Sequence, residues 1–170
     1  MKTIKASQKP NRRQILTMGA VSGIAVSLGS TTNSSAQAQA QAATMPKIEI
    51  ARLEDLTLGT EINFYFPDED SPAVLLVLAE QVQDGIGPEQ NIVAFSSLCT
   101  HKGCQVNYYE EHKMLICPCH WSSFDPAKKG RIIIGQASSG LPQITLAIEN
   151  GSVHATGITG LIYGRQTNVL

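Results

Sequence analysis

Residues that could bind a metal ion are concentrated in two short segments of the chain. All four cysteines lie in these segments, which read Cys99-Thr100-His101-Lys102-Gly103-Cys104 and Cys117-Pro118-Cys119-His120. Each segment contains two cysteines and one histidine. Thiolate and imidazole are the protein groups that bind zinc and iron centres. Because the rest of the chain contains no cysteine, this clustering predicts a metal site.

Two kinds of metal site are open at this point. A structural zinc ion takes four ligands, commonly from close Cys-Cys or His-His pairs, whereas this chain offers six candidates in Cys-x-His and Cys-x-x-His spacings. A two-iron, two-sulfur cluster with mixed ligands takes one cysteine and one histidine from each segment. Cys99 with His101 and Cys117 with His120 fit that pattern, and a zinc module is the alternative.

The two segments resemble the paired cluster-binding boxes of Rieske iron–sulfur proteins. The resemblance implies a [2Fe-2S] cofactor whose cysteine ligands bind one iron and whose histidine ligands bind the other: Cys99, Cys117, His101 and His120. It also implies that Cys104 and Cys119 form a disulfide that clamps the two loops together, which suits an oxidising compartment. The segment 135–142 is similar to the third loop that packs over the cluster in this family.

The residues after His120 predict how the surroundings would tune this cluster. High-potential members continue His-Gly-Ser-x-Tyr-Asp, whereas this chain reads His-Trp-Ser-Ser-Phe-Asp. Ser122 keeps a hydroxyl that would donate to a cluster sulfur, but Phe124, at the tyrosine position, has none. Since such donors raise the reduction potential, we expect a value between the respiratory and oxygenase types. Trp121 replaces a glycine, and three roles are open for it: shielding, partner contact and core packing.

Within this family the chain resembles the small subunit of bacterial arsenite oxidase. The resemblance rests on the second box, on 126–135 and Leu141-Pro142, and on the tail 160–166. It implies a molybdopterin-containing large subunit that oxidises arsenite and passes electrons through this chain to a soluble cytochrome c or copper protein. The chain itself would have no substrate-converting site. The alternatives are the Rieske subunit of a quinol–cytochrome c oxidoreductase, anchored by an uncleaved N-terminal helix, and an oxygenase ferredoxin.

The N-terminal 44 residues have the composition of an export signal rather than of a folded domain. Five of the 13 basic residues lie in the first 13 positions, and no charge follows until Lys47. An apolar run, 15–28, and a small-residue segment rich in Ala-Gln come next, which is the order of a secretory signal. Arg12-Arg13 makes it a twin-arginine candidate, so we expect a periplasmic protein. The apolar run is shorter than the roughly 20 residues of a membrane span, but membrane association follows if the leader is retained.

Residues 45–170 predict an all-β, small antiparallel Rieske-type domain with an inserted cluster-binding subdomain at about 97–142. Strands are expected at 73–78, 92–95, 113–116, 131–134 and 144–148, with an Asn150-Gly151 hairpin turn after the last. The near-neutral total charge of −1 argues against nucleic acid as a partner. The tail 158–170 has few charges and is a candidate for packing on a partner rather than folding back.

Overall fold

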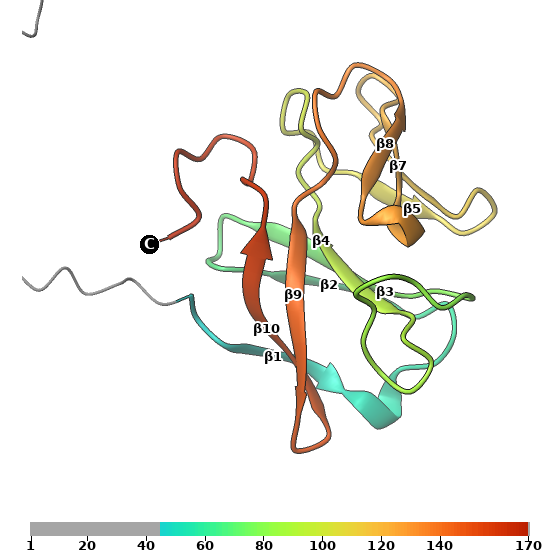
Figure 1. Ribbon diagram of the computed structural model, residues 1–170. Helices are drawn as coiled ribbons and strands as arrows, with labels where there is room; N and C mark the ends of the chain where they lie inside the picture. Colours follow the sequence, from blue (N-terminus) through green and yellow to red (C-terminus); the bar gives the residue numbers. More distant parts are fainter. Residues whose placement is uncertain (1–44, 170) are drawn as a thin grey trace, which may run out of the picture. The chain divides into compact units, whose positions relative to one another are not determined.

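The computed structural model describes residues 45–169, which form two antiparallel sheets (Figure 1). The predicted export signal, 1–44, and the terminal Leu170 lie outside the described residues. Within 45–169, no helix has the length and apolar character that a membrane crossing needs. The only regular helices of this range are two short 3-10 turns, so the all-β prediction is confirmed.

The larger sheet has six strands in the order β1-β10-β9-β4-β3-β2. Their bounds are β1 Ile48–Arg52, β2 Glu61–Tyr65, β3 Pro72–Val77, β4 Ile92–Ser96, β9 Gln143–Glu149 and β10 Ser152–Thr159. A 3-10 turn, η1 Leu53–Asp55, follows β1. At the β9–β10 turn, Asn150 and Gly151 both have positive φ, at 50° and 76°, as the predicted hairpin requires.

The smaller sheet has four short strands in the order β5-β6-β7-β8. Their bounds are β5 Asn107–Tyr109, β6 Met114–Ile116, β7 Ser123–Asp125 and β8 Arg131–Ile134. A second 3-10 turn, η2 Pro126–Lys128, lies between β7 and β8, and Asp125 caps it by accepting a hydrogen bond from the backbone N–H of Ala127. This sheet falls between β4 and β9 in sequence, inside the segment expected to bind the cluster.

Two hydrophobic clusters explain why the central strands have continuous apolar sequences. On one face of the large sheet, Leu75 and Ala94 pack with residues of β1, β2, β9 and β10. On the other face, Leu76 and Phe95 pack against Leu115 and other residues of the small sheet. Since β3 and β4 are buried on both faces, they lack the apolar–polar alternation of a half-exposed strand.

The C-terminal tail folds back on the domain, so the expectation that it packs on a partner instead is wrong. Ile162 is 1% exposed, and Arg165 forms an ion pair with Asp68 and donates to the Ser71 hydroxyl at 2.7 Å. The side chain of Asn168 accepts a hydrogen bond from the backbone N–H of Ile162 at 3.0 Å. The two contacts of Arg165 join sites about 95 residues apart in sequence, which a pattern of local residues cannot reveal.

Candidate metal centre

The first cysteine segment forms a compact turn directly after β4. The backbone N–H of Cys99 donates to the carbonyl of Cys104 at 2.9 Å, and the N–H of Gly103 donates to the carbonyl of Cys99 at 2.8 Å. Gly103 has a φ of +74°, a left-handed conformation that glycine adopts without steric cost. The turn holds Cys99 in the core at 1% exposure and places His101 at its outer side, half-buried.

The second cysteine segment repeats this turn with different residues. The N–H of Cys117 donates to the carbonyl of Ser122, and the N–H of Trp121 donates to the carbonyl of Cys117, both at 2.9 Å. Trp121 therefore takes the place that Gly103 has in the first turn, and it has the same left-handed backbone, with a φ of +59°. Cys117 is 1% exposed and His120 lies on the surface.

A disulfide joins the two turns. Cys104 and Cys119 are bonded to each other, as the resemblance implied, while Cys99 and Cys117 are free. The sulfurs of Cys104, Cys117 and Cys119 lie within 4.8 Å of one another. Two of these three sulfurs are engaged in the disulfide, so the bridge lies against Cys117 rather than forming a metal site with it.

The two histidines, one from each of the turns that the disulfide joins, lie beside each other. The rings of His101 and His120 have centroids 4.7 Å apart in an edge-to-face arrangement. Nδ1 of His101 is buried and has no hydrogen-bond partner among the described residues. A buried polar nitrogen without a partner is costly, and coordination of a metal would satisfy it.

The two free thiols also interact with each other. Burial raises the pKa of the Cys99 thiol, and the neighbouring Cys117 raises it further, while the backbone amides of His101 and Lys102 act in the opposite direction. Those amides favour the thiolate form, which is the form that binds metal. Iron binding at Cys99 would therefore release a proton.

A third loop, 135–142, covers the two turns. The backbone N–H groups of Gln136 and Ala137 donate to the hydroxyl of Ser122, at 3.0 and 3.1 Å. The hydroxyl of Thr100 donates to the carbonyl of Ser139 at 2.6 Å. Gly135 permits this approach, because a Cβ there would lie 2.4 Å from the Cα of Ser122.

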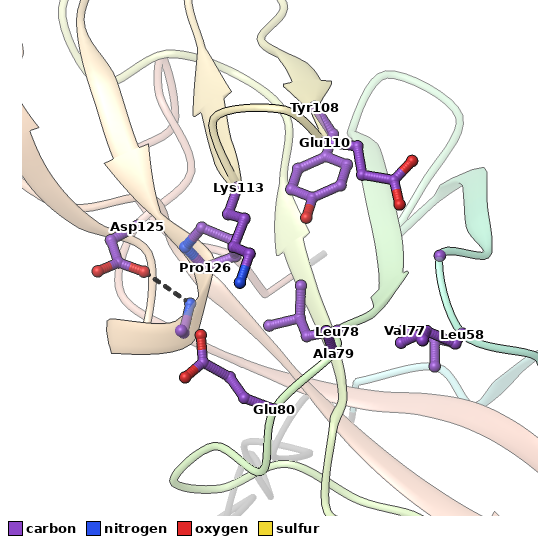
Figure 2. Close-up of a pocket in the computed structure, with 12 residues that line it drawn as sticks. Leu58, Val77, Leu78, Ala79, Glu80, Tyr108, Glu110, Lys113, Asp125 and Pro126 are labelled. Carbon is purple, nitrogen blue, oxygen red and sulfur yellow. Dashed lines mark hydrogen bonds between the residues drawn. The ribbon is translucent and has the colours of Figure 1, made fainter.

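A hollow on another part of the domain is separate from these turns (Figure 2). Leu58, Leu78 and Pro126 supply apolar walls, and Tyr108 and Lys113 supply polar groups. Burial raises the pKa of Tyr108, with the negative charges of Glu110 and Glu61 adding to the effect. The four predicted cluster ligands do not line this hollow, so it is no part of the candidate metal centre.

Comparison with known proteins decides the nature of the centre. The sequence pattern of the Rieske [2Fe-2S] domain matches residues 47–145. The chain belongs to the Rieske [2Fe-2S] family. Its cofactor is accordingly the Rieske-type [2Fe-2S] cluster, and the zinc alternative is wrong.

Two Rieske relatives are similar over nearly the whole chain. They are the iodate reductase subunit IdrB of Denitromonas iodatirespirans, 35% identical over 93% of this chain and 86% of its own, and that of Pseudomonas sp. (strain SCT), 34% identical over 91% and 82%. The cytochrome bc1 complex Rieske iron–sulfur subunit of Streptomyces lividans is 35% identical, but over only 54% of this chain and 59% of its own.

A solved Rieske structure has the same fold. The soluble domain of the Rieske protein II (soxF) from Sulfolobus acidocaldarius matches with a TM-score of 0.64 and 22% identity, over 72% of this chain and 82% of its own. At this identity the similarity concerns the fold alone.

The residues of the two turns fit a Rieske cluster. Two buried thiols, two neighbouring imidazoles and the unpartnered Nδ1 of His101 form a mixed sulfur–nitrogen donor set of the required kind. The structure places His101 beside His120 and Cys99 beside Cys117, while the assignment of all four as the ligands stays a prediction.

The residues that follow His120 differ in their burial and in their contacts. Ser122 is fully buried, and its oxygen accepts two hydrogen bonds, so its own proton is free to donate. Phe124 is fully buried in the hydrophobic cluster that also contains Cys99 and Cys117. Trp121 is 70% exposed, which excludes the core-packing role. Sequence reasoning missed Thr100 as the link to the third loop, because its partner is 39 residues away.

Proposed function

We propose that this chain is the electron-transfer subunit of an exported oxidoreductase whose large, molybdopterin-containing subunit converts the substrate. The observation that carries the proposal is similarity over almost the entire length of two subunits of a reductase, rather than over the cluster-binding segment alone. A Rieske cluster takes up and releases one electron at a time, so this chain relays electrons between the large subunit and a second redox protein.

The geometry supports His120 as a point of electron exchange. His120 lies on the surface beside the exposed Trp121, whereas His101 is half-buried and both cysteines are in the core. Of the four predicted ligands, His120 is therefore the one that a redox partner docked on this surface reaches most directly. The partner that exchanges electrons with the centre outside the complex is a soluble cytochrome c or a copper protein.

Arsenite and iodate are the two candidate substrates of the large subunit. The sequence resemblance to arsenite oxidase small subunits favours oxidation of arsenite to arsenate, in which electrons leave the large subunit through this chain. The similarity to two iodate reductase subunits favours iodate reduction, in which electrons flow the opposite way. The quinol–cytochrome c alternative has weaker support, because the bc1 relative matches only 54% of the chain.

We propose that the protein reaches the periplasm by the twin-arginine route, with its cluster already assembled, and that it is membrane-associated only if its leader is retained. The basis is the order of Arg12-Arg13, the apolar run and the Ala-Gln segment. An Arg12→Lys, Arg13→Lys variant is expected to stay in the cytoplasm with its cluster. Cell fractionation with electron paramagnetic resonance of each fraction tests this.

The decisive experiment is purification of the native complex followed by addition of each substrate. Arsenite added to the oxidised complex is expected to bleach the visible absorption and produce the rhombic resonance of the reduced cluster. Iodate added to the reduced complex is expected to restore the colour if the reductase function is correct. If the chain purifies with a cytochrome b subunit and responds to quinol, the proposed function is wrong.

A further inference from the structure

The side chain of Trp121 contributes little to the stability of the fold. It is 70% exposed, although the next residue, Ser122, is fully buried. A tryptophan stabilises a folded protein mainly by removing its large ring from water. At this exposure most of that gain is lost, so packing does not explain the residue.

The backbone at Trp121 is also unfavourable for a tryptophan. Its φ of +59° lies in the left-handed region, where a side chain with a Cβ is disfavoured. In the otherwise equivalent first turn this position is Gly103, with a φ of +74°. The two turns make the same pair of hydrogen bonds, so the conformation itself requires no side chain here.

The surface around Trp121 is almost free of charge. We define the cluster face as residues 99–104, 117–122 and 134–140, which are the two turns, the last residue of β8 and the third loop up to the buried Leu141. Lys102 is its one charged residue, and all 14 acidic residues of the chain lie elsewhere. Ile134, which is 68% exposed, pairs with Ser123 in the small sheet, two residues beyond Trp121.

The low charge of the cluster face indicates whether its redox partner is transient or a permanent subunit. Proteins that meet briefly to exchange electrons rely on complementary charge to associate quickly. Subunits that stay together bury apolar surfaces instead, with aromatic residues over-represented at the centre. The cluster face, with one charge and two exposed large apolar side chains, fits a permanent subunit.

We propose that Trp121 anchors this chain to the large catalytic subunit, by inserting its indole ring into an uncharged apolar recess of that subunit. The anchor sets His120 against the partner's own electron-transfer group. This inference rests on the proposed function, since it requires such a subunit.

The test compares Trp121→Gly and Trp121→Phe in the co-expressed complex, with Leu58→Ala as a control. Leu58 is 67% exposed and lies outside the cluster face. We expect Trp121→Gly to weaken association about thirtyfold or more, as loss of an interface anchor does. Trp121→Phe should retain most of the affinity, and Leu58→Ala should change nothing. Association is measured by diluting each purified, cluster-loaded complex and following the fraction of this chain that has dissociated from the large subunit.

Thermal unfolding of the chain alone separates an anchor from a structural residue. Glycine suits the left-handed backbone, so Trp121→Gly should unfold at the wild-type temperature or above it and keep its cluster resonance. A lowered unfolding temperature with unchanged affinity would assign Trp121 to the fold and overturn the proposal. Unchanged affinity with slower electron exchange to the soluble acceptor would also overturn it, by placing that acceptor on the face. If the wild-type chain binds no catalytic subunit, the proposed function fails and this inference with it.

Discussion

The large sheet has strands of five to eight residues, whereas the strands of the small sheet have three or four. The large sheet contributes to both hydrophobic clusters, with Leu75 on one face and Phe95 on the other. The small sheet adds Leu115 and Phe124 to only one of them. Its far end consists of turns held by a disulfide and by hydrogen bonds to Ser122.

This difference shows that the two regions depend on different interactions. In the large sheet, burial of apolar side chains offsets the entropy lost on folding. A sheet with such short strands buries too little apolar surface to offset this entropy. We therefore expect the disulfide and the metal–ligand bonds to stabilise the small sheet and its turns. Substitutions in the large sheet should therefore change mainly the free energy of unfolding, whereas substitutions in the cluster-binding turns should change mainly the signals of the cluster.

The largest effect is expected from Cys99→Ser, which should abolish cluster binding. Serine lacks the soft thiolate that iron–sulfur clusters require. We expect iron content near zero and no rhombic resonance on reduction. A Cys104→Ser, Cys119→Ser double variant is the matched control, because it also removes cysteine sulfur yet should still bind iron. Full iron occupancy in Cys99→Ser would refute the ligand assignment.

In the large sheet, Leu75→Ala should lower the free energy of unfolding by about 2–5 kcal/mol, as cavities in a packed core do. Leu75 is completely buried, and its variant should keep the cluster resonance of the wild type while folded. Ile148→Ala, at a position 39% exposed on β9, should cost less than about 0.5 kcal/mol. Denaturant unfolding followed by circular dichroism measures both. Equal losses of unfolding free energy in the two variants would mean that burial of apolar side chains is not the main source of stability in the large sheet.

Loss of the disulfide should destabilise the cluster end selectively. The bridge closes a loop with a sequence separation of 15, for which about 3 kcal/mol is expected. In the Cys104→Ser, Cys119→Ser variant, visible absorption from the cluster should disappear at a lower denaturant concentration than the circular dichroism of the strands. Coincident transitions would show that the two regions unfold as one unit.

Ser122→Ala should destabilise the third loop and lower the reduction potential. It leaves the N–H groups of Gln136 and Ala137 without their acceptor, at a cost of about 1–3 kcal/mol. One lost hydrogen bond to the cluster, worth about 0.5–1.5 kcal/mol, corresponds to about 20–60 mV for one electron. Ser123→Ala removes a neighbouring buried hydroxyl, which donates to the carbonyl of Trp121 instead, and should leave the potential unchanged. Voltammetry distinguishes the two.

The smallest effect concerns the tail, where Arg165 pairs with Asp68 in the loop between β2 and β3. The Arg165 guanidinium holds the pKa of Asp68 below its ordinary value of 3.8. This ion pair therefore contributes its full stability above pH 3.8 and loses it as the pH falls through the lower folded-state pKa. Arg165→Met should cost no more than about 1 kcal/mol at pH 7, and the difference from wild type should shrink in acid. Unfolding measured at pH 7 and at pH 3 tests this; a difference that grows in acid would contradict it.

Strong local patterns made several elements predictable. The apolar run 73–78 became β3, Arg131–Ile134 matches β8, and Asn150-Gly151 formed its hairpin turn. β5 and β7 were missed, because their three residues lack the continuous apolar sequence that indicated β6, Met114–Ile116, a strand of the same length. β1 and β2 were missed as well. In β2, the half-buried Ile62 and Phe64 alternate with exposed residues, so the sequence did contain an alternating pattern.

The sequence by itself predicted a mixed sulfur–nitrogen metal centre, because four cysteines and two histidines fall in two short segments of matching content. The match to the Rieske family then identified the cluster. Only the tertiary structure decided which neighbours of these cysteines and histidines are buried or exposed. In the folded protein, Ser122 is buried under the third loop, the tail forms an ion pair with Asp68, and Trp121 is exposed to solvent. Ligand spacing is local along the chain, whereas burial depends on which distant segments meet, and that is settled only when the two sheets pack together.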